Sequence, residues 1–387
     1  MRELFTLGVE EEYLLVDPAT GELRSAGAGV LETDRSGEVI GEAQETLVEI
    51  GTPVCHDGAE LMERLRERRF QAGAAAAAAD LDLLALGTHP ISGWKGHELA
   101  KSERSAMLQE RFRHIVRLDH ICGMHVHVAV PDSFDRIAVM NRLRAWTPHL
   151  LALAASSPFH AGEDTGYASI RTMMWRRYPL SGVPPHFASQ EEHRHFMDTL
   201  LRSGMIPDER TVYWSIRPSP RYPTIELRVC DVCPSIGDAV AIAVLARSLV
   251  ITAAEERLPD PAAALPDSLH DVILRENEWT AARDGLDAEL VAPDRADVRV
   301  SIRSSLDELL ERVAPIAASV GDADALQGIG TILARGTAAD RLRDLYDRHR
   351  DLLPVTRWAV EETRASIGMD RRAARRDDAN GGYSLVS

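Results

Sequence analysis

Side chains that can bind metal ions and phosphate stand at alternate positions of three short segments. The segments are residues 8–15 (GVEEEYLL), 123–130 (GMHVHVAV) and 224–229 (TIELRV). Residues two apart on a β-strand project from the same face, so each segment, if extended, puts two such side chains on one face. The pairs are Glu10 with Glu12, His125 with His127, and Glu226 with Arg228. We therefore expect three strands to present these pairs on one polar face of a sheet.

A fourth acidic segment, residues 41–54 (GEAQETLVEIGTPV), supplies further carboxylates, among them Glu42. If residues 46–54 are extended, Glu45 and Glu49 share a face. Hard divalent ions such as Mg²⁺ prefer carboxylate oxygens with an occasional imidazole, and they keep positions for water and phosphate. The candidate ligands, enough for two ions, are Glu10, Glu12, Glu45, Glu49, His125 and Glu226. The alternative is that the glutamates form solvated ion pairs on an open sheet face.

Three arginines are candidates for binding anionic groups of a substrate. Arg228 shares its predicted strand face with Glu226, and Arg217 lies in the proline-rich segment WSIRPSPRYP, where the prolines would stiffen the chain around it. Planar guanidinium groups bind phosphate and carboxylate bidentately. Arg217 and Arg228 are therefore predicted phosphate-binding residues. Arg171 is a candidate for a substrate carboxylate, although a plain surface charge is the alternative there.

Other motifs in the sequence point elsewhere and are weaker. Cys230 and Cys233 form a CxxC pair, and Cys122 lies close in sequence to His125, but a second closely spaced thiol pair is missing, which disfavours a structural zinc site. The sequence contains no GxxxxGK[ST] phosphate-binding loop. His89 is expected to be a hydrogen-bonded structural histidine.

Length and charge restrict the class of protein. The 387 residues, 45% of them hydrophobic, can form a substantial core, and 60 acidic against 44 basic residues give a net charge of −16. Such a charge would repel a nucleic acid, so an anionic ligand would need local cations. We find no signal-peptide pattern and no stretch that approaches the roughly 20 uncharged apolar residues needed to span a bilayer. Four cysteines are too few for a disulfide scaffold, and a cytoplasmic protein is expected.

The order of predicted elements indicates an α+β fold. Strands are expected only within the first 230 residues, near 5–16, 47–54, 84–88, 123–130, 212–216 and 224–229. Helices are expected near 59–84, 101–118, 133–154, 190–203, 238–256, 267–282, 301–318, 323–335, 338–349 and 355–366. Residues 155–188 lack periodicity and are predicted to form a long functional loop. We expect one catalytic domain, residues 1–370, with a sheet-containing part (1–235) and a helical part (236–370). Residues 371–387 are predicted to be a disordered tail.

The motifs GVEEE, ETLVEIGTPV, GTHP, GMHVHV, SSPF, SIR, WSIRPSP and TIELRVCD occur in an order that resembles the type 2 glutamate–cysteine ligases. These carboxylate–amine ligases are part of the glutamine synthetase superfamily, and the resemblance covers about residues 5–255. It implies a curved, mainly antiparallel sheet. Its concave, polar face would bind ATP and two or three Mg²⁺ or Mn²⁺ ions, with helices packed on the other face.

The resemblance also implies roles for individual residues. Glu10, Glu12, Glu49, His125 and Glu226 would be metal ligands, with Glu45 as a weaker match. Arg228 would bind phosphate, whereas the roles of His127 and Glu42 are left open.

Together, the residues and the resemblance predict ATP-dependent ligation of the γ-carboxylate of glutamate to an amine, most plausibly that of cysteine. Two alternatives stay open at this point: a zinc-dependent amidohydrolase that uses His125, His127 and the cysteines, and a non-catalytic nucleotide or metabolite sensor. The expected partners are small molecules rather than nucleic acid or membrane. The resemblance and the long helices also make a homodimer possible.

Overall fold

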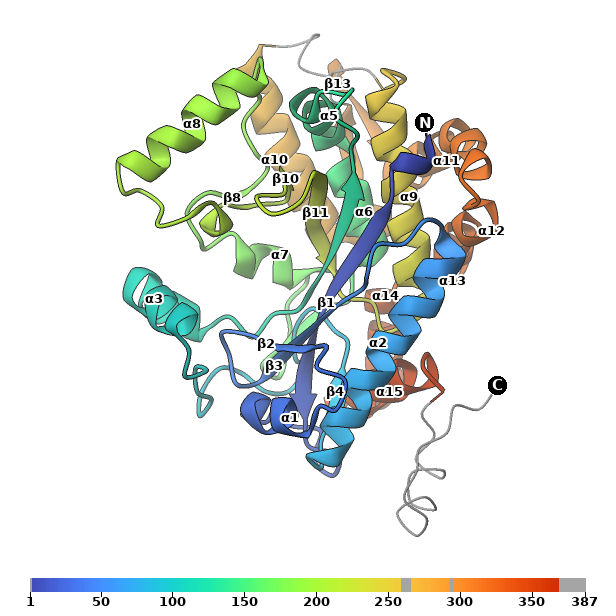
Figure 1. The fold of residues 1–387 in the computed structure, drawn as a ribbon. Helices are drawn as coiled ribbons and strands as arrows, with labels where there is room; N and C mark the ends of the chain where they lie inside the picture. Colours follow the sequence, from blue (N-terminus) through green and yellow to red (C-terminus); the bar gives the residue numbers. More distant parts are fainter. Residues whose placement is uncertain (1, 259–265, 293–294, 369–387) are drawn as a thin grey trace.

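A computed structural model describes residues 2–258, 266–292 and 295–368, and an antiparallel sheet runs through its centre (Figure 1). The strand order is β10-β11-β5-β1-β3-β2, and the short strand β4 also pairs with β1. The strands are β1 (Leu7–Val16), β2 (Val39–Gly41), β3 (Leu47–Gly51), β4 (Asp82–Leu84), β5 (Gly123–Ala129), β10 (Ile216–Pro218) and β11 (Thr224–Asp231). The sheet thus joins all the segments in which alternating polar side chains predict a site.

The sheet has one apolar face because the alternation in β1 places Val9 and Tyr13 in the core, where both are almost completely buried. Glu11 also points to this face, and Arg69 neutralises it through an ion pair of 2.6 Å between two buried side chains. A buried carboxylate requires such a partner, because an unpaired charge in the core is very costly. The polar face of the same strand is thereby left to Glu10 and Glu12.

Helices cover the apolar face. The N-terminal and central helices are α1 (Gly27–Thr33), α2 (Gly58–Ala78), α3 (Glu103–Phe112), α4 (His114–Arg117), α5 (Arg136–Leu143), α6 (Thr147–Ala154), α7 (Ile170–Trp175) and α8 (Gln190–Arg202). The later helices are α9 (Ile236–Ala254), α10 (Asp267–Asp284), α11 (Ile302–Ser319), α12 (Ala323–Leu326), α13 (Gly328–Arg335), α14 (Ala338–His349) and α15 (Leu352–Ala365). Helices α2, α6 and α9 contact the sheet directly. In Figure 1, α11 to α15 gather on the same side as α2 and α9, whereas α3 and α8 project on the other side.

Among the described residues, helix α9 comes nearest to a membrane-spanning composition, although Asp238 and Arg247 interrupt its apolar sequence. Its 19 residues have a mean hydropathy of 1.8, which by length and composition would allow the helix to cross a membrane. However, 89% of this stretch is buried inside the protein, where Arg247 of the same helix pairs with Asp322 at 3.0 Å. This burial is typical of the core helix of a globular protein. The predicted cytoplasmic location stays a prediction.

The expectation that strands occur only within the first 230 residues is wrong. Strands β12 (Glu289–Ala292) and β13 (Arg295–Ser301) form an antiparallel hairpin in the C-terminal part. Leu290 and Ala292 of β12 are buried, and β12 packs against α10. Strand β12 has only four residues, and none of the seven residues of β13 is buried, so neither strand has a marked apolar face that a period of two could reveal. The predicted tail, residues 371–387, lies outside the described residues.

Several predicted elements are divided in the structure. The expected helix 101–118 forms α3 and α4, because Arg113 between them has a positive φ of 53° that interrupts the helix. The expected helix 133–154 is divided by a 3₁₀ turn at Arg144–Trp146. The expected loop 155–188 contains α7 and the short strands β6 (Phe159–His160), β7 (Glu163–Asp164) and β8 (Ser181–Gly182). Strand β8 pairs in parallel with β9 (Tyr213–Trp214).

Candidate active site

The polar face of the sheet opens into a cavity of about 1060 Å³, a volume that includes its solvent-filled mouth. Strands β1, β5 and β11 contribute six charged or imidazole side chains to its lining: Glu10, Glu12, His125, His127, Glu226 and Arg228. The alternation predicted for the three segments is therefore confirmed. Strand register brings the residues together, since Glu10 lies opposite His125, Glu12 opposite Glu49, and Glu226 opposite both His127 and Arg217.

Three carboxylates, those of Glu12, Glu42 and Glu49, form a compact group. Their oxygens lie within 4.8 Å of one another, and one Glu12 oxygen accepts a hydrogen bond from the backbone N–H of Gly123 at 2.6 Å. Burial, followed by the charge of Glu42, raises the pKa of Glu12 to about 7 and that of Glu49 well above its ordinary value. Carboxylates this close repel one another, and a divalent cation among them would remove the repulsion.

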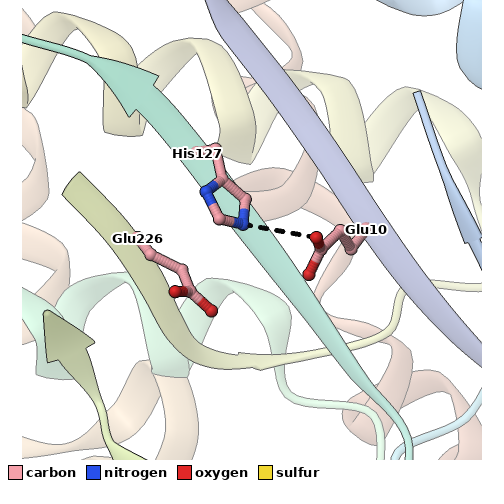
Figure 2. Close-up of side chains that lie close together, drawn as sticks. All are labelled: Glu10, His127 and Glu226. Atoms are coloured by element: carbon pink, nitrogen blue, oxygen red, sulfur yellow. Dashed lines mark ion pairs between the residues drawn. The ribbon is translucent and has the colours of Figure 1, made fainter. Parts of the chain in front are cut away.

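A second group consists of Glu10 on β1, His127 on β5 and Glu226 on β11, as Figure 2 shows. Their ligand atoms also lie within 4.8 Å of one another, and the dashed line in the figure joins His127 Nε2 to Glu10 Oε1 at 3.5 Å. On the far side of its ring, His127 Nδ1 lies 3.0 Å from the Thr224 hydroxyl, which fixes the ring orientation. Two carboxylates and an imidazole suit a second divalent ion.

His125 lies beside this second group. Its Nδ1 is 3.3 Å from Glu10, whereas its buried Nε2 has no hydrogen-bond partner among the described residues. Burial, followed by the charge of Arg228, lowers the pKa of His125 to about 4, so the ring is neutral at pH 7. Burial alone would raise the pKa of Glu10, but hydrogen bonds from His125 and His127 outweigh it and lower that pKa. The contact with His125 is therefore a hydrogen bond to an ionised Glu10, and Nε2 is free to bind a metal.

Arg217 and Arg228 both contact Glu226. Arg217 Nε and Nη2 lie 2.9 and 3.2 Å from the two carboxylate oxygens, and Arg228 Nη1 donates to one of them. Burial would raise the pKa of Glu226, but the two arginine charges outweigh it and lower that pKa below the ordinary value. The buried Nε of Arg228 has no partner among the described residues. Two guanidinium groups thus lie beside the second metal-ligand group, and the Arg228 Nε–H can still donate a hydrogen bond to a ligand.

The structure does not bring Glu45 or Arg171 to the cavity lining. Strand β3 begins at Leu47, so the alternation does not extend back to Glu45, whose carboxylate accepts the backbone N–H of Ala28 at 2.9 Å and so supports the start of α1. Arg171 lies in α7 rather than in a loop. Its buried guanidinium faces Asp231 at 3.9 Å and the backbone carbonyl of Arg228 at 3.4 Å. Its place beneath β11 corrects the expectation of a substrate-binding loop residue.

Proteins of known family are similar to this chain over nearly its whole length. The sequence model of glutamate–cysteine ligase family 2 matches residues 6–363. A protein of Sorangium cellulosum that is provisionally named glutamate–cysteine ligase 2 is 34% identical over 94% of this chain and 97% of its own. A relative from Nocardia farcinica, provisionally named glutamate–cysteine ligase 2-1, is 40% identical over 90% of this chain and 91% of its own.

The chain belongs to glutamate–cysteine ligase family 2. A solved structure, the glutamate–cysteine ligase of Francisella tularensis in complex with AMP, is similar in fold with a TM-score of 0.67. The match covers 99% of this chain and 96% of the other, at 15% identity, so it supports the fold. The α+β fold with an antiparallel sheet predicted for the family is confirmed.

Two residues of this family 2 chain belong to the metal-ligand groups although the sequence left their roles open. Glu42 precedes β3 in a connection whose path cannot be read from periodicity, but its place in an acidic segment was a signal. The position of His127 on the polar face follows from the same strand alternation that predicts the position of His125. Asp119, Tyr178 and Tyr213 line the cavity as well, and no pattern in the sequence marks them.

The cysteines are not positioned for the zinc chemistry of an amidohydrolase. Cys55, Cys122, Cys230 and Cys233 are free and buried, and neither metal-ligand group found in the described part of the chain includes a thiol. Burial raises the pKa of Cys122 well above its ordinary value, which disfavours the thiolate that zinc requires. The oxygen-rich groups suit Mg²⁺ or Mn²⁺, and the unpartnered Nε2 of His125 fits a metal ligand.

Proposed function

We propose that this protein is an ATP-dependent ligase that joins the γ-carboxylate of glutamate to an amine, with cysteine as the first amine to test. The observation that carries the proposal is the convergence of two oxygen-rich metal-ligand groups and two buried arginines on one sheet face of a family 2 chain. ATP brings four negative charges to the cavity, and this cation-binding face offers partners for them although the whole chain carries a charge of −16.

The reaction needs activation because a carboxylate oxygen is a poor leaving group. A carboxylate oxygen of glutamate attacks the γ-phosphorus of ATP, and ADP leaves. The amine nitrogen then attacks the carbonyl carbon of the acyl phosphate, phosphate leaves with the bonding electrons, and the nitrogen loses a proton. Both steps require close positioning and stabilisation of negative charge rather than a protein nucleophile. Buried cysteines with raised thiol pKa values agree with this requirement.

The side chains divide these tasks. Glu12, Glu42 and Glu49 would hold one divalent cation, and Glu10, His127 and Glu226 a second one beside His125. Mg²⁺ or Mn²⁺ bound there would supply positive charge to the phosphate oxygens.

Arg217 and Arg228 would stabilise charge on the transferring phosphoryl group. Their planar guanidinium groups suit phosphate oxygens, and Arg228 Nε is already without a partner in the described structure. Removing one such contact typically costs about 3 kcal/mol of transition-state stabilisation. Their contacts with Glu226 also couple the phosphate-binding side chains to the metal-ligand group.

The test is phosphate release by the purified full-length protein with ATP, Mg²⁺, glutamate and a panel of amines that includes cysteine. We expect release that requires both the acid and an amine, with formation of the γ-glutamyl amide detected by mass spectrometry. Glu226→Gln should reduce turnover on the order of 100-fold while the protein stays folded. The control is Glu63→Gln, which changes an exposed glutamate on α2 and should leave turnover unchanged. Release without any amine, or none with the whole panel, contradicts the proposal.

A sensor that binds nucleotide without turnover makes a different prediction in the same experiment. Such a protein would bind ATP with unchanged affinity in the presence of every amine and would release no phosphate. The pairing of metal-ligand groups with Arg217 and Arg228 favours the ligase, since charge stabilisation at the γ-phosphate serves transfer and is not needed to retain the nucleotide.

A further inference from the structure

One wall of the cavity is aromatic. Trp175, Tyr178 and Tyr213 all line it, and their ring centroids lie 5.0 to 5.8 Å apart in pairs. The Trp175 indole N–H donates to the backbone carbonyl of Tyr213 at 2.9 Å, which fixes two of the rings relative to each other. Phe112 packs edge-on against Tyr178 at 4.7 Å from behind. The wall is therefore a rigid cluster that presents ring surface to the same cavity as the metal-ligand groups.

Asp119 adds a negative charge to this wall. It lies in the short connection between α4 and β5, and one of its oxygens accepts a hydrogen bond from the Tyr178 hydroxyl at 2.9 Å. Within residues 2–258, 266–292 and 295–368, no lysine or arginine forms an ion pair with it. Burial raises the pKa of Asp119 to about 7, even though the hydrogen bond from Tyr178 and the charges of Arg171 and Arg177 lower it. The carboxylate thus faces the cavity without a cation of its own.

Two arginines beside Trp175 are engaged elsewhere. The Arg228 guanidinium lies 5.5 Å from the Trp175 ring centroid and forms an ion pair with Glu226. Arg171 lies 5.9 Å from the same ring and faces Asp231. Both cations lie over Trp175, whereas the carboxylate of Asp119 is bonded to Tyr178. Arg228 thus lies beside the metal-ligand groups, whereas Tyr178 lies beside a carboxylate that forms no ion pair within the described residues. The charges of Arg171 and Arg177 act on this carboxylate from a greater distance, and Arg104 also lines the cavity.

We propose that Asp119, with the rings of Tyr178 and Tyr213, binds the protonated amino group of a substrate and makes the enzyme select for it. A carboxylate forms charge-assisted hydrogen bonds with an ammonium group, and aromatic faces attract the same cation. This inference rests on the proposed ligase function, because it assigns one end of the substrate cavity. The ammonium group has two possible sources, the α-amino group of the acid substrate or the amino group of the incoming amine.

The experiment compares substrates with analogues that lack only the amino group. Glutamate is paired with glutarate, and cysteine with 3-mercaptopropionate. Binding of each compound is measured by calorimetry in the presence of Mg²⁺ and a non-hydrolysable ATP analogue, so the result does not require turnover. We expect the wild-type protein to bind the amino compound of at least one pair more than tenfold more tightly, because hydrogen bonds to charged groups are worth a factor of roughly 10 to 100. The pair that shows the preference identifies the source of the ammonium group.

Asp119→Asn keeps an oxygen that can accept the Tyr178 hydroxyl but removes the charge. The preference for the amino compound should fall to less than threefold in this variant, while affinity for the ATP analogue stays within twofold. Asp119→Ala should give the same loss and serves if the asparagine variant does not fold. Asp132→Asn, at an exposed side chain three residues beyond the end of β5, is the matched control. An unchanged preference in both Asp119 variants, or no preference in the wild type for either pair, overturns the inference.

The failure of this inference can be told apart from failure of the proposed function. If phosphate release occurs but Asp119 variants keep the amino-group preference, the ligase function stands and the assignment of Asp119 is wrong. If the wild type releases no phosphate while Asp119 still governs the preference in calorimetry, the ammonium site stands and the ligase function is wrong.

Discussion

Replacing Glu12 with glutamine removes a charge from the three-carboxylate group with little change of shape. Burial, followed by the charge of Glu42, raises the Glu12 pKa from its ordinary value of 4.5 to about 7. The folded state therefore favours the protonated form. Its stabilising contribution is fully present below pH 4.5 and is lost as the pH rises through about 7. At pH 8 without metal, an ionised Glu12 thus destabilises the fold.

The structure sets the size of this effect. A pKa change from 4.5 to about 7 corresponds to about 3 kcal/mol. Because the Glu12 side chain is partly exposed, screening by solvent reduces the expected value to ~2 kcal/mol. The glutamine oxygen can still accept the hydrogen bond from the Gly123 N–H, which Glu12 accepts at 2.6 Å. We therefore expect Glu12→Gln to stabilise the metal-free protein at pH 8 by ~2 kcal/mol, or roughly 2–4 °C in Tm.

The assay is thermal unfolding of both proteins at pH 8 and pH 5, in EDTA and in excess Mg²⁺. In EDTA, most of the difference in stability between the variant and the wild type should disappear at pH 5, where Glu12 of the folded protein is protonated. Mg²⁺ at about 100 times its Kd should stabilise the wild type by about 2.7 kcal/mol and the variant by much less. Glu63→Gln should show neither effect. A variant that is less stable than the wild type in EDTA at pH 8, or that gains as much from Mg²⁺, would refute the reasoning.

Three further predictions concern the residues around the site. Arg69→Met leaves Glu11 buried without its partner and should lower the free energy of unfolding by about 3–5 kcal/mol, measured by urea unfolding. Gly123→Ala would place a Cβ 2.1 Å from Arg171 Nη2, so we expect a loss of at least ~1–3 kcal/mol in the same measurement, and equal stability would contradict this packing. Arg217→Gln should lower kcat for phosphate release by on the order of 100-fold, with far-UV circular dichroism unchanged.

The polar face of the site was predictable from the sequence because it depends on strand alternation alone. Glu10, Glu12, His125 and Glu226 lie inside strands that are extended on both sides of each residue, so the period of two places them correctly. Glu45 shows the limit of the same rule. The strand begins two residues later, at Leu47, and before that point the chain turns so that Glu45 meets the start of α1. A pattern of period two carries no information beyond the end of the strand.

Features that depend on packing between distant segments could not be predicted in this way. Arg171 was expected in a loop, but α7 forms there and buries the guanidinium beneath β11, against Asp231. Asp119 and Tyr178 are 59 residues apart, and their hydrogen bond exists only because the segments that follow α4 and α7 meet at one wall of the cavity. Neither residue belongs to a periodic or spaced motif, so only the three-dimensional structure brings them together.

The two faces of the sheet neutralise their glutamate charges in different ways. Glu11 lies between Glu10 and Glu12 in sequence but faces the core, where Arg69 satisfies it permanently at 2.6 Å. Glu12 and Glu49 face the cavity, where no lysine or arginine of the described residues forms an ion pair with them and where their pKa values are raised. Burying either kind of glutamate is unfavourable. Arg69 offsets this for Glu11, whereas Glu12 and Glu49 can be stabilised by a cation that binds from solution. The raised pKa values of Glu12 and Glu49 are thus a physical sign of carboxylates that an ion from solution can neutralise, whereas Glu10 and Glu226 on the same face have lowered pKa values because histidine and arginine side chains are their partners.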